Sequence, residues 1–308
     1  MICNIQWNSL TFPEWEQRFK ALNRTNLLQS YPYAQSLAEL KGQKPRWGVI
    51  TIDGKEAGLI QILEVSLFFK AIHAVILDRG PIWFENFGNS EHMSAFFTEF
   101  NRQFPSRIGR KRRIIPETDF NIEPLGYQKI GTGYETIWVN LTQSEGDLRA
   151  NLVRNWRGTL QKAENADLTI DWDNKGQHLD WLMQNYAVDK ETKGYEGPSV
   201  KLLRTLAKYH LPRDEMLIGR ASRNGKPVAG ILILCHGNAA TYQIGFTSPE
   251  GRDNGAHHLL LWQALGVLKF KRIRDFDLGG INDDTAKGVK RFKEGLGGET
   301  FTLGGIYT

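Results

Sequence analysis

The chain has 308 residues, of which 41% are hydrophobic and 24% charged, which is the composition of a globular protein with ample material for a core. This length allows two domains of ordinary size or one large domain. The net charge of +5 permits a polyanionic partner without demanding one. The two cysteines, Cys3 and Cys235, are far apart and show no metal spacing, which excludes a disulfide framework and a zinc motif.

The N-terminal region and the apolar stretches predict a protein of the cytoplasm. Residues 1–15 have no basic segment followed by a long apolar one, so they do not resemble a signal peptide. The longest candidate membrane span, residues 59–77, is interrupted by polar side chains such as Gln61 and Glu64. A spanning helix needs about 20 mostly apolar residues, so no transmembrane segment is expected.

Three helices are expected in the first part of the chain. A capping box with proline in the first turn opens the first helix, at residues 11–22. A glycine ends the second, at residues 32–41. The third is capped by Ser90 and carries one apolar face, which indicates that it covers a core.

One hairpin pattern occurs twice. Residues 47–63 and residues 217–234 each read as strand, turn, strand. Their turns are Asp53-Gly54 and Asn224-Gly225, which supply the positive φ angles of a tight hairpin. The repetition favours a duplicated domain, although two common hairpins can also be similar by chance.

Helices and strands follow in a regular order in the second part of the chain. A capping box at residues 142–145 opens a helix with apolar positions from Leu148 to Ala163 at helical spacing. The remaining expected elements are helices near 177–187 and 199–210, the hairpin, a strand at 239–246, a helix at 255–271, a strand at 275–278 and a helix at 284–296.

The order of helices, antiparallel strands, helix and strand, written twice, predicts an α+β fold with mixed, mostly antiparallel sheets flanked by helices. A doubly wound parallel sheet would alternate strand and helix more strictly. We expect an N-terminal subdomain at residues 1–141 and a C-terminal subdomain at residues 142–308, with the last few residues able to return to the first.

The end of the chain is its most informative stretch. Asp275 to Gly280 reads as a strand with a glycine turn, and Phe292-Lys293 lies on the helix that follows, before a Gly297-Gly298 stop. This arrangement predicts a cation, Lys293, and a carboxylate, Asp277, near the mouth of a sheet. Asp283 and Asp284 are expected to cap that helix.

Several motifs, taken in order, resemble the Fem-type (FemABX) aminoacyltransferases of peptidoglycan bridge synthesis. They are Leu28-Gln29-Ser30 before Tyr33-Ala34, Arg79-Gly80-Pro81-Ile82, the basic segment from Arg157 to Ala163, Phe276 to Gly280, Phe292-Lys293 and Gly297. The resemblance implies two tandem GNAT-like subdomains (acyl-CoA N-acyltransferase-like). It also implies aminoacyl-tRNA as donor, a peptidoglycan precursor or other small amine as acceptor, and no further cofactor.

The chain departs from the family at three places. It has no room for the long helical hairpin that larger members insert in the second subdomain. Leu37 stands where members that bind a nucleotide-linked precursor have a lysine, and Lys41 is the nearest one. Lys193 is the nearest equivalent of an arginine that contacts the precursor, so it is the predicted contact here.

Amide formation from an ester passes through a tetrahedral oxyanion, which a fixed cation can stabilise. The resemblance gives Lys293 this role and places Phe292 at the substrate; the alternative is a surface lysine on a basic helix. Tyr242 matches a family tyrosine that contacts the acceptor, with a core tyrosine as the alternative. Strand alternation predicts Tyr242 and Ile244 on one face.

Candidates for moving the proton are carboxylates. Asp277 can accept a proton or orient the amine, or else hold the glycine turn. Glu117 and Asp119 are further candidates, and the base need not be a protein side chain. Arg154 and Arg157 share one side of a helix, where they contact phosphate or are merely solvated.

The strongest charge run has no acid: Arg102, Arg107, Arg110, Lys111, Arg112 and Arg113. Arg110, Lys111, Arg112 and Arg113 are predicted to bind tRNA phosphates, with a solvated basic loop as the alternative. A second basic patch spans residues 269–274.

One motif favours a different enzyme class. Residues 252–257 fit the R/Q-x-x-G-x-G/A pattern with which acyl-CoA-dependent GNAT enzymes hold pyrophosphate, except that His257 takes the last position. An acyl-CoA N-acyltransferase is therefore the alternative, and a non-catalytic RNA-binding protein is a third possibility. The seven histidines show no metal spacing, so no metal is expected.

Overall fold

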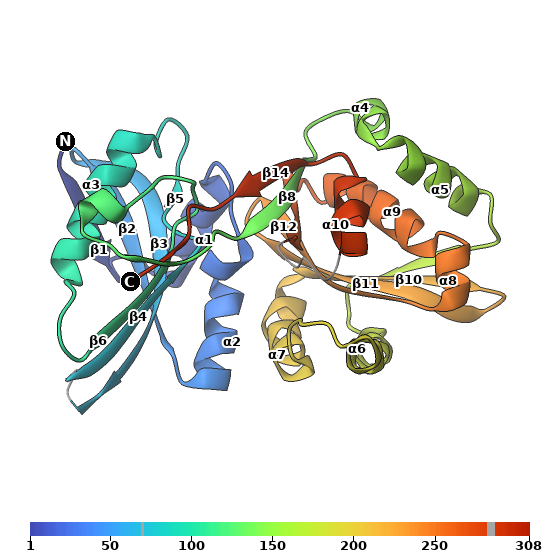
Figure 1. The fold of residues 1–308 in the computed structure, drawn as a ribbon, viewed down its shortest axis with the longest axis horizontal. Coiled ribbons are helices and arrows are strands. Elements are labelled where there is room, and N and C mark those ends of the chain that lie inside the picture. Colours follow the sequence, from blue (N-terminus) through green and yellow to red (C-terminus); the bar gives the residue numbers. More distant parts are fainter. Residues whose placement is uncertain (69–70, 282–286) are drawn as a thin grey trace. The chain divides into compact units, whose positions relative to one another are not determined.

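The computed structural model describes residues 1–68, 71–281 and 287–308 (Figure 1). The chain forms two compact units, one from residues 1–134 with 302–308 and the other from residues 135–301. Each unit is a mixed, mostly antiparallel sheet with helices on both faces. The predicted α+β class, with two units of mixed and mostly antiparallel sheet, is therefore confirmed. The predicted cap residues Asp283 and Asp284 lie outside the described residues.

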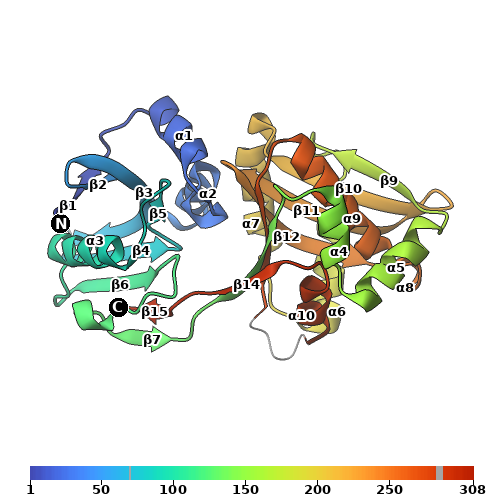
Figure 2. The same cartoon turned by 90° about the horizontal axis from the view of Figure 1, so that it is seen from above.

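The first unit contains three α-helices and the whole of one sheet. Its helices are α1 (Phe12–Ala21), α2 (Tyr31–Lys41) and α3 (Ser90–Gln103), with short 3₁₀ turns at Leu27–Gln29 and Glu123–Leu125. Its strands are β1 (Cys3–Trp7), β2 (Lys44–Ile52), β3 (Lys55–Leu67), β4 (Ile72–Asp78), β5 (Ile82–Trp83), β6 (Arg110–Ile115), β7 (Lys129–Gly131) and β15 (Ile306–Tyr307). The order is β1-β2-β3-β4-β6-β15-β7, and Figure 2 shows its last four strands side by side.

The core of the first unit has two layers because adjacent residues of a strand face opposite sides of the sheet. On β3, Ile60 packs with the phenylalanines of α3, and Leu59 packs with Trp15 and Phe19 of α1. The predicted capping box holds α1, since the Thr11 N–H donates to Glu14 Oε2 at 2.8 Å.

The second unit repeats this plan. Its helices are α4 (Glu145–Asn151), α5 (Arg154–Glu164), α6 (Leu179–Lys193), α7 (Val200–His210), α8 (Pro249–Asp253), α9 (Ala256–Phe270) and α10 (Lys287–Glu294). Its strands are β8 (Glu135–Asn140), β9 (Thr169–Asp173), β10 (Met216–Arg223), β11 (Lys226–His236), β12 (Ala239–Thr247), β13 (Asp275–Gly280) and β14 (Glu299–Thr302). They are ordered β14-β8-β13-β12-β11-β10-β9, with α5 and α9 on one face and α6 and α7 on the other (Figure 1).

Both predicted hairpins carry the same irregularity. The turns Asp53-Gly54 and Asn224-Gly225 have positive φ angles, as expected. Three residues after each turn glycine, the register slips by one residue, at Ala57 in one hairpin and at Val228 in the other. A shared β-bulge at the same place supports a duplicated domain.

Three local predictions differ from the structure. The helix expected after residue 145 is divided into α4 and α5, because Leu152 and Val153 have extended backbone angles. The alternative of a solvated basic loop is wrong for Arg110 to Arg113, which lie in the strand β6. A bulge in β12 pairs Tyr242 with Ile233 and Ile244 with Leu232, so Tyr242 and Ile244 point to opposite faces of the sheet.

Candidate active site

The two sheets differ at their parallel strand pair. In the first unit, β4 and β6 stay paired over residues 73–78 and 110–115. In the second unit, β12 and β13 pair only over residues 239–241 and 275–277 and then separate. Backbone and side-chain groups at such an opening are available to a ligand, as at the switch point of a parallel sheet. The second unit therefore has an opening in its sheet that the first unit lacks at the equivalent strands.

A cavity of about 590 Å³ lies at this opening, and all its lining residues belong to the second unit. Its walls are the end of β12, the end of α6 with the segment that follows, the loop before α9 with the start of that helix, and α10. Four predicted site residues line it together: Lys193, Tyr242, Phe292 and Lys293. They come from three separate elements, so the fold brings together what the sequence holds apart.

Lys293 is a cation held away from water. Its side chain is only 8% exposed, and its Nζ donates to the Gly280 carbonyl at 2.9 Å. The Nζ also lies 5.8 Å from the centroid of the Tyr242 ring. Burial lowers the pKa of Lys293 from 10.5 to about 8, and the nearby Asp277 carboxylate partly opposes this shift. The group is therefore mostly an ammonium at neutral pH.

Asp277 lies beneath the cavity wall. It is fully buried, and its Oδ1 accepts hydrogen bonds from the Thr136 hydroxyl and from the Gly279 N–H. The Gly279 bond, 2.8 Å long, fixes the turn where φ is +73°. These contacts fit the turn-holding role, and the charge of Asp277 also acts on Lys293. Its role as a proton acceptor stays a prediction.

Tyr242 is anchored by a residue that the sequence did not single out as part of the site. The Tyr242 hydroxyl and His257 Nε2 share a hydrogen bond of 3.1 Å. Burial lowers the pKa of His257 to about 3, so the ring is neutral, and burial raises the pKa of Tyr242. Gly245 makes room for the pair, since a Cβ there would lie 2.7 Å from His257 Nε2.

Phe292 is set by aromatic contacts. Its ring centroid lies 5.1 Å from that of His257 and 4.9 Å from that of His258, both in edge-to-face geometry. Trp156 Nε1 donates to the Phe292 carbonyl at 3.0 Å, which ties α10 to α5. Phe292 thus forms part of the wall beside the Lys293 ammonium.

Lys193 is the last residue of α6 rather than part of the loop before α7. Its Nζ forms an ion pair with Asp189 Oδ1 at 2.6 Å, and both residues line the cavity. The end of α6 therefore brings one positive and one negative charge to the cavity wall.

The two arginines of α5 do not line the cavity. Arg157 donates to the carbonyls of Ala150 at 3.1 Å and Leu152 at 2.9 Å, so it caps the end of α4. Arg154 is exposed at the first position of α5. Phosphate contact by either residue stays a prediction.

The basic run is divided by strand alternation. Arg112 is buried, donates to Asn101 Oδ1 at 2.7 Å and lies over the Tyr127 ring. Arg113 pairs with Asp78 at 2.7 Å, and Arg110 donates to His73 Nδ1 at 3.3 Å. Lys111 is exposed. The structure therefore accounts for much of this charge within the first unit, and tRNA contact stays a prediction.

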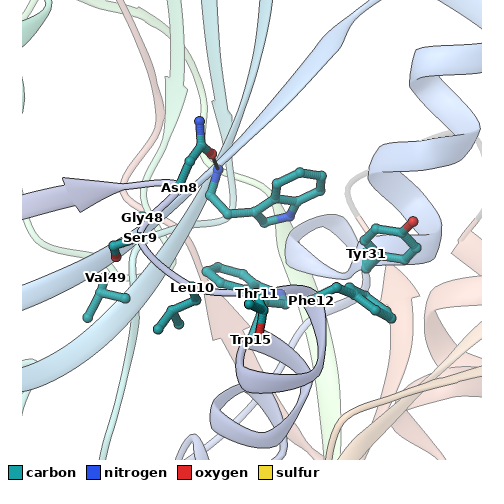
Figure 3. Close-up of a pocket in the computed structure, with 10 residues that line it drawn as sticks. Asn8, Ser9, Leu10, Thr11, Phe12, Trp15, Tyr31, Gly48 and Val49 are labelled. Atoms are coloured by element: carbon teal, nitrogen blue, oxygen red, sulfur yellow. Dashed lines mark hydrogen bonds between the residues drawn. The ribbon is translucent and has the colours of Figure 1, made fainter.

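The first unit has its own cavity, of about 240 Å³, which Figure 3 shows between α1, the start of α2 and β2. Phe12, Trp15 and Tyr31 contribute rings to it, and none of the described residues that line it is a cation or a carboxylate. The candidate base Glu117 forms a buried, bidentate ion pair with Arg79 at 2.6 and 2.7 Å. The aromatic cavity has no cation in its described lining, whereas the second-unit cavity has Lys293, so the second-unit cavity is the candidate active site.

The loop before α9 is where the structure can test the acyl-CoA motif. Gly251, Arg252 and Gly255 line the cavity, and Gly255 has a φ of +66° against α5. His257 fills the space beside the first turn of α9 with a ring bound to Tyr242. In the sequence, the only indication of this role was that histidine, and not glycine or alanine, takes the last position of the motif. Among the residues described, no group of three or more His, Cys, Asp or Glu side chains is placed to hold a metal ion.

Fold and site together define a tandem GNAT-type scaffold with an open cavity at the parallel strand pair of its second unit. Residues 149–294 match the family model described as acetyltransferase (GNAT) domain. No curated protein sequence matches the chain. The family match covers α5 to α10, which contains the cavity and Lys293, and it supports an acyltransferase.

Three solved structures are similar over nearly the whole chain. FemX has a TM-score of 0.79 at 14% identity and covers 98% of this chain and 96% of its own. A conserved protein of unknown function from Bacteroides thetaiotaomicron has a TM-score of 0.63 at 13% identity, covering 99% and 98%. A tandem GNAT protein from the clavulanic acid biosynthesis pathway has a TM-score of 0.50 at 11% identity, covering 99% and 98%. The chain has the Fem-type tandem GNAT fold.

Proposed function

We propose that the protein is an aminoacyltransferase of the cytoplasm that moves an amino acid from aminoacyl-tRNA to an amine of a peptidoglycan precursor or another small acceptor. The Lys293 ammonium carries this proposal. It is buried at the wall of the only part of the second-unit sheet where the described parallel strands separate, facing a cavity large enough for an acyl group.

The chemistry asks for a cation at this place. The acceptor amine attacks the carbonyl carbon of the aminoacyl ester, and the carbonyl oxygen becomes an oxyanion. When the intermediate collapses, the C–N bond is complete, the C–O bond to the tRNA ribose breaks, and the amine's proton goes to the ribose oxygen. A preorganised donor at the oxyanion lowers the barrier by about 3 kcal/mol. Lys293 is that donor in this proposal.

The other lining residues receive supporting roles. Tyr242 and Phe292 contact the reacting groups, Lys193 contacts the acceptor, and Asp277 sets the charge around Lys293 or takes the proton. Arg154, Arg157 and the basic run 110–113 bind phosphates of the substrates. No cofactor beyond the charged tRNA takes part.

An acyl-CoA N-acyltransferase is the second candidate. It is favoured by the family match over residues 149–294 and by Gly251, Arg252 and Gly255 at the cavity. Against it stands His257, which takes the motif position where a small residue would let the backbone approach a diphosphate, and whose ring is bound to Tyr242.

The test compares two acyl donors and two lysine variants of the protein. The protein is incubated with an amine acceptor and either tRNA carrying a radiolabelled amino acid or acetyl-CoA, and product and released CoA are measured. We expect amide product from charged tRNA, a loss of about 100-fold or more in Lys293→Met, and no such loss in Lys290→Met. Lys290 lies on the same helix but pairs with Glu135 at 3.4 Å. CoA release without transfer from tRNA would favour the second candidate.

Binding of tRNA is measured separately. Contacts between cations and phosphates release counterions, so the affinity should fall steeply as salt rises. Binding that does not respond to salt would contradict a tRNA donor held through phosphates.

A further inference from the structure

One end of the first unit's sheet exposes a group of large apolar side chains. Leu67, Phe68, Ile72 and Ile108 are each more than half exposed, and Phe68 and Ile108 reach 75% and 99%. Single exposed apolar residues are ordinary, but a contiguous group on a folded surface marks an interaction site.

These four side chains belong to one place in the fold. Leu67, the last residue of β3, pairs with Ile72, the first residue of β4. The Ala71 N–H donates to the Phe68 carbonyl at 2.9 Å, and the His73 N–H donates to the Gly109 carbonyl at 2.8 Å, directly after Ile108. Figure 1 shows the end of β3 and the start of β4 at the same end of the sheet as the start of β6. We call the four residues the apolar tip.

The apolar tip is surrounded by positive charge. Arg107, Arg110 and Lys111 flank Ile108, and neither residues 65–74 nor residues 102–113 contain an acid. The acid at the start of this region, Glu64, is engaged by His73 at 2.9 Å and by Arg46 at 3.7 Å. The apolar side chains therefore lie among cations that outnumber acids.

This combination distinguishes two anionic partners. RNA phosphates attract the cations, but exposed leucine and isoleucine side chains gain nothing from a phosphate backbone. An anionic bilayer uses both features, because apolar side chains enter the boundary between headgroups and acyl chains while cations lie against lipid phosphates. Aromatic and basic residues are also those that anchor proteins at this boundary.

We propose that the apolar tip docks the protein on the surface of an anionic lipid bilayer. The contact is peripheral, since none of the described helices is long and apolar enough to cross a bilayer. The proposal goes beyond acyl transfer and does not rest on it, so either can fail alone.

The experiment is flotation of the full chain with vesicles of phosphatidylcholine, with or without about 30% phosphatidylglycerol. The tip variant is Phe68→Ser with Ile108→Ser, and the charge variant is Lys111→Glu. The matched control is Phe270→Ser with Val188→Ser, which removes one exposed aromatic residue (91%) and one exposed aliphatic residue (60%) from the second unit. Circular dichroism and thermal unfolding confirm that the variants are folded, and binding to uncharged tRNA is measured in parallel.

We expect the protein to float with anionic vesicles and not with neutral ones. Vesicle binding should weaken about tenfold in the tip variant and in the charge variant, while the control variant binds normally. Absence of vesicle binding, equal binding to neutral vesicles, or equal loss in the control variant would overturn the proposal. A tip variant that loses tRNA binding and keeps vesicle binding would overturn it in favour of RNA.

Discussion

Lys293 carries a charge that the fold makes dependent on pH. Its pKa of about 8 means that the ammonium is present at neutral pH and is lost as the pH rises through that value. If the ammonium stabilises the oxyanion, the rate of the transfer step should fall as the pH rises above about 8. Single-turnover rates between pH 6 and pH 10 check this, with the intrinsic hydrolysis of the ester subtracted. A rate that stays constant through pH 9 would remove the ammonium from the mechanism.

The burial of Lys293 also predicts that its ammonium lowers the stability of the folded state at neutral pH. The pKa of Lys293 in the folded state, about 8, lies below its unfolded value of 10.5, so the unfolded state binds more protons at intermediate pH. At neutral pH the buried ammonium therefore costs on the order of 3 kcal/mol. Lys293→Met should be no less stable than the unchanged protein in urea unfolding, even as it loses activity. A clear destabilisation would show that the Gly280 hydrogen bond outweighs the cost of burial.

Tyr242 and Tyr186 provide a matched pair of hydroxyls in one cavity. The Tyr242 hydroxyl bonds to His257 beside Lys293, whereas the Tyr186 hydroxyl donates to the Pro198 carbonyl at 3.0 Å. Tyr242→Phe should lower kcat about tenfold, because the ring beside the ammonium loses its anchor. Tyr186→Phe should leave kcat unchanged. Steady-state kinetics of both variants test this prediction. An equal fall of kcat in the two variants would mean that the Tyr242 hydroxyl only supports the fold.

The motifs of the sequence named four residues that meet at one cavity, but they did not reveal contacts that depend on folding. Lys193, Tyr242, Phe292 and Lys293 all line the cavity, as a joint site requires, although their roles stay predictions. The anchoring contact of His257 could not be predicted, because it needs β12 and α9 to lie side by side. The burial of Arg112 was not predicted either. It follows from the run being a strand, in which successive side chains alternate between the two faces of the sheet.

At the scale of elements, the bulge in β12 orients the site. It places Tyr242 and Gly245 on the same side of the sheet, where a regular strand would place residues three apart on opposite sides. A side chain at position 245 would therefore collide with the Tyr242 hydroxyl and the His257 ring. The bulge and the glycine together make the space in which these two residues meet.

Gly245→Ala should accordingly reduce activity about tenfold or more by displacing Tyr242 and His257. The matched control is Gly266→Ala in α9, where a Cβ meets no atom within 4 Å. That control should gain about 0.5–1 kcal/mol of stability, because alanine favours a helix interior over glycine. Kinetics and urea unfolding of both variants provide the measurement. Full activity in Gly245→Ala would show that the pair can move without consequence.

Elements were predictable where a local signal fixes the backbone. The turns of both hairpins follow from Asp-Gly and Asn-Gly, and α1 follows from its capping box. The division between α4 and α5 was not predictable, because Leu148, Leu152 and Trp156 have helical spacing and are all buried. A continuous helix and two helices with a break at Leu152 have the same apolar pattern in the sequence. Only the packing of the folded chain decides between these two arrangements.

For the whole molecule, the sequence predicted two similar units but not how they differ. In both, a run of four antiparallel strands, β1 to β4 or β9 to β12, is followed by a strand that is parallel to the last of them and reached through a helix. The units differ in how far the parallel pair extends: over six residues of each strand in the first unit and over three in the second. The two units therefore share one plan, but the parallel strands stay paired in the first unit and separate at the cavity in the second.

The C-terminal residues complete the first unit from the far end of the chain. Tyr307 is 1% exposed, belongs to the core of the first unit, and lies in β15, which pairs with β6 and β7. Tyr307→Ala should therefore cost about 3–5 kcal/mol in urea unfolding, as for a large aromatic removed from a core. The control is Ile130→Ala on neighbouring β7, where the side chain is exposed and the loss should stay below about 0.5 kcal/mol. If Tyr307→Ala unfolded as the control does, the return of the chain to the first unit would contribute nothing to its stability.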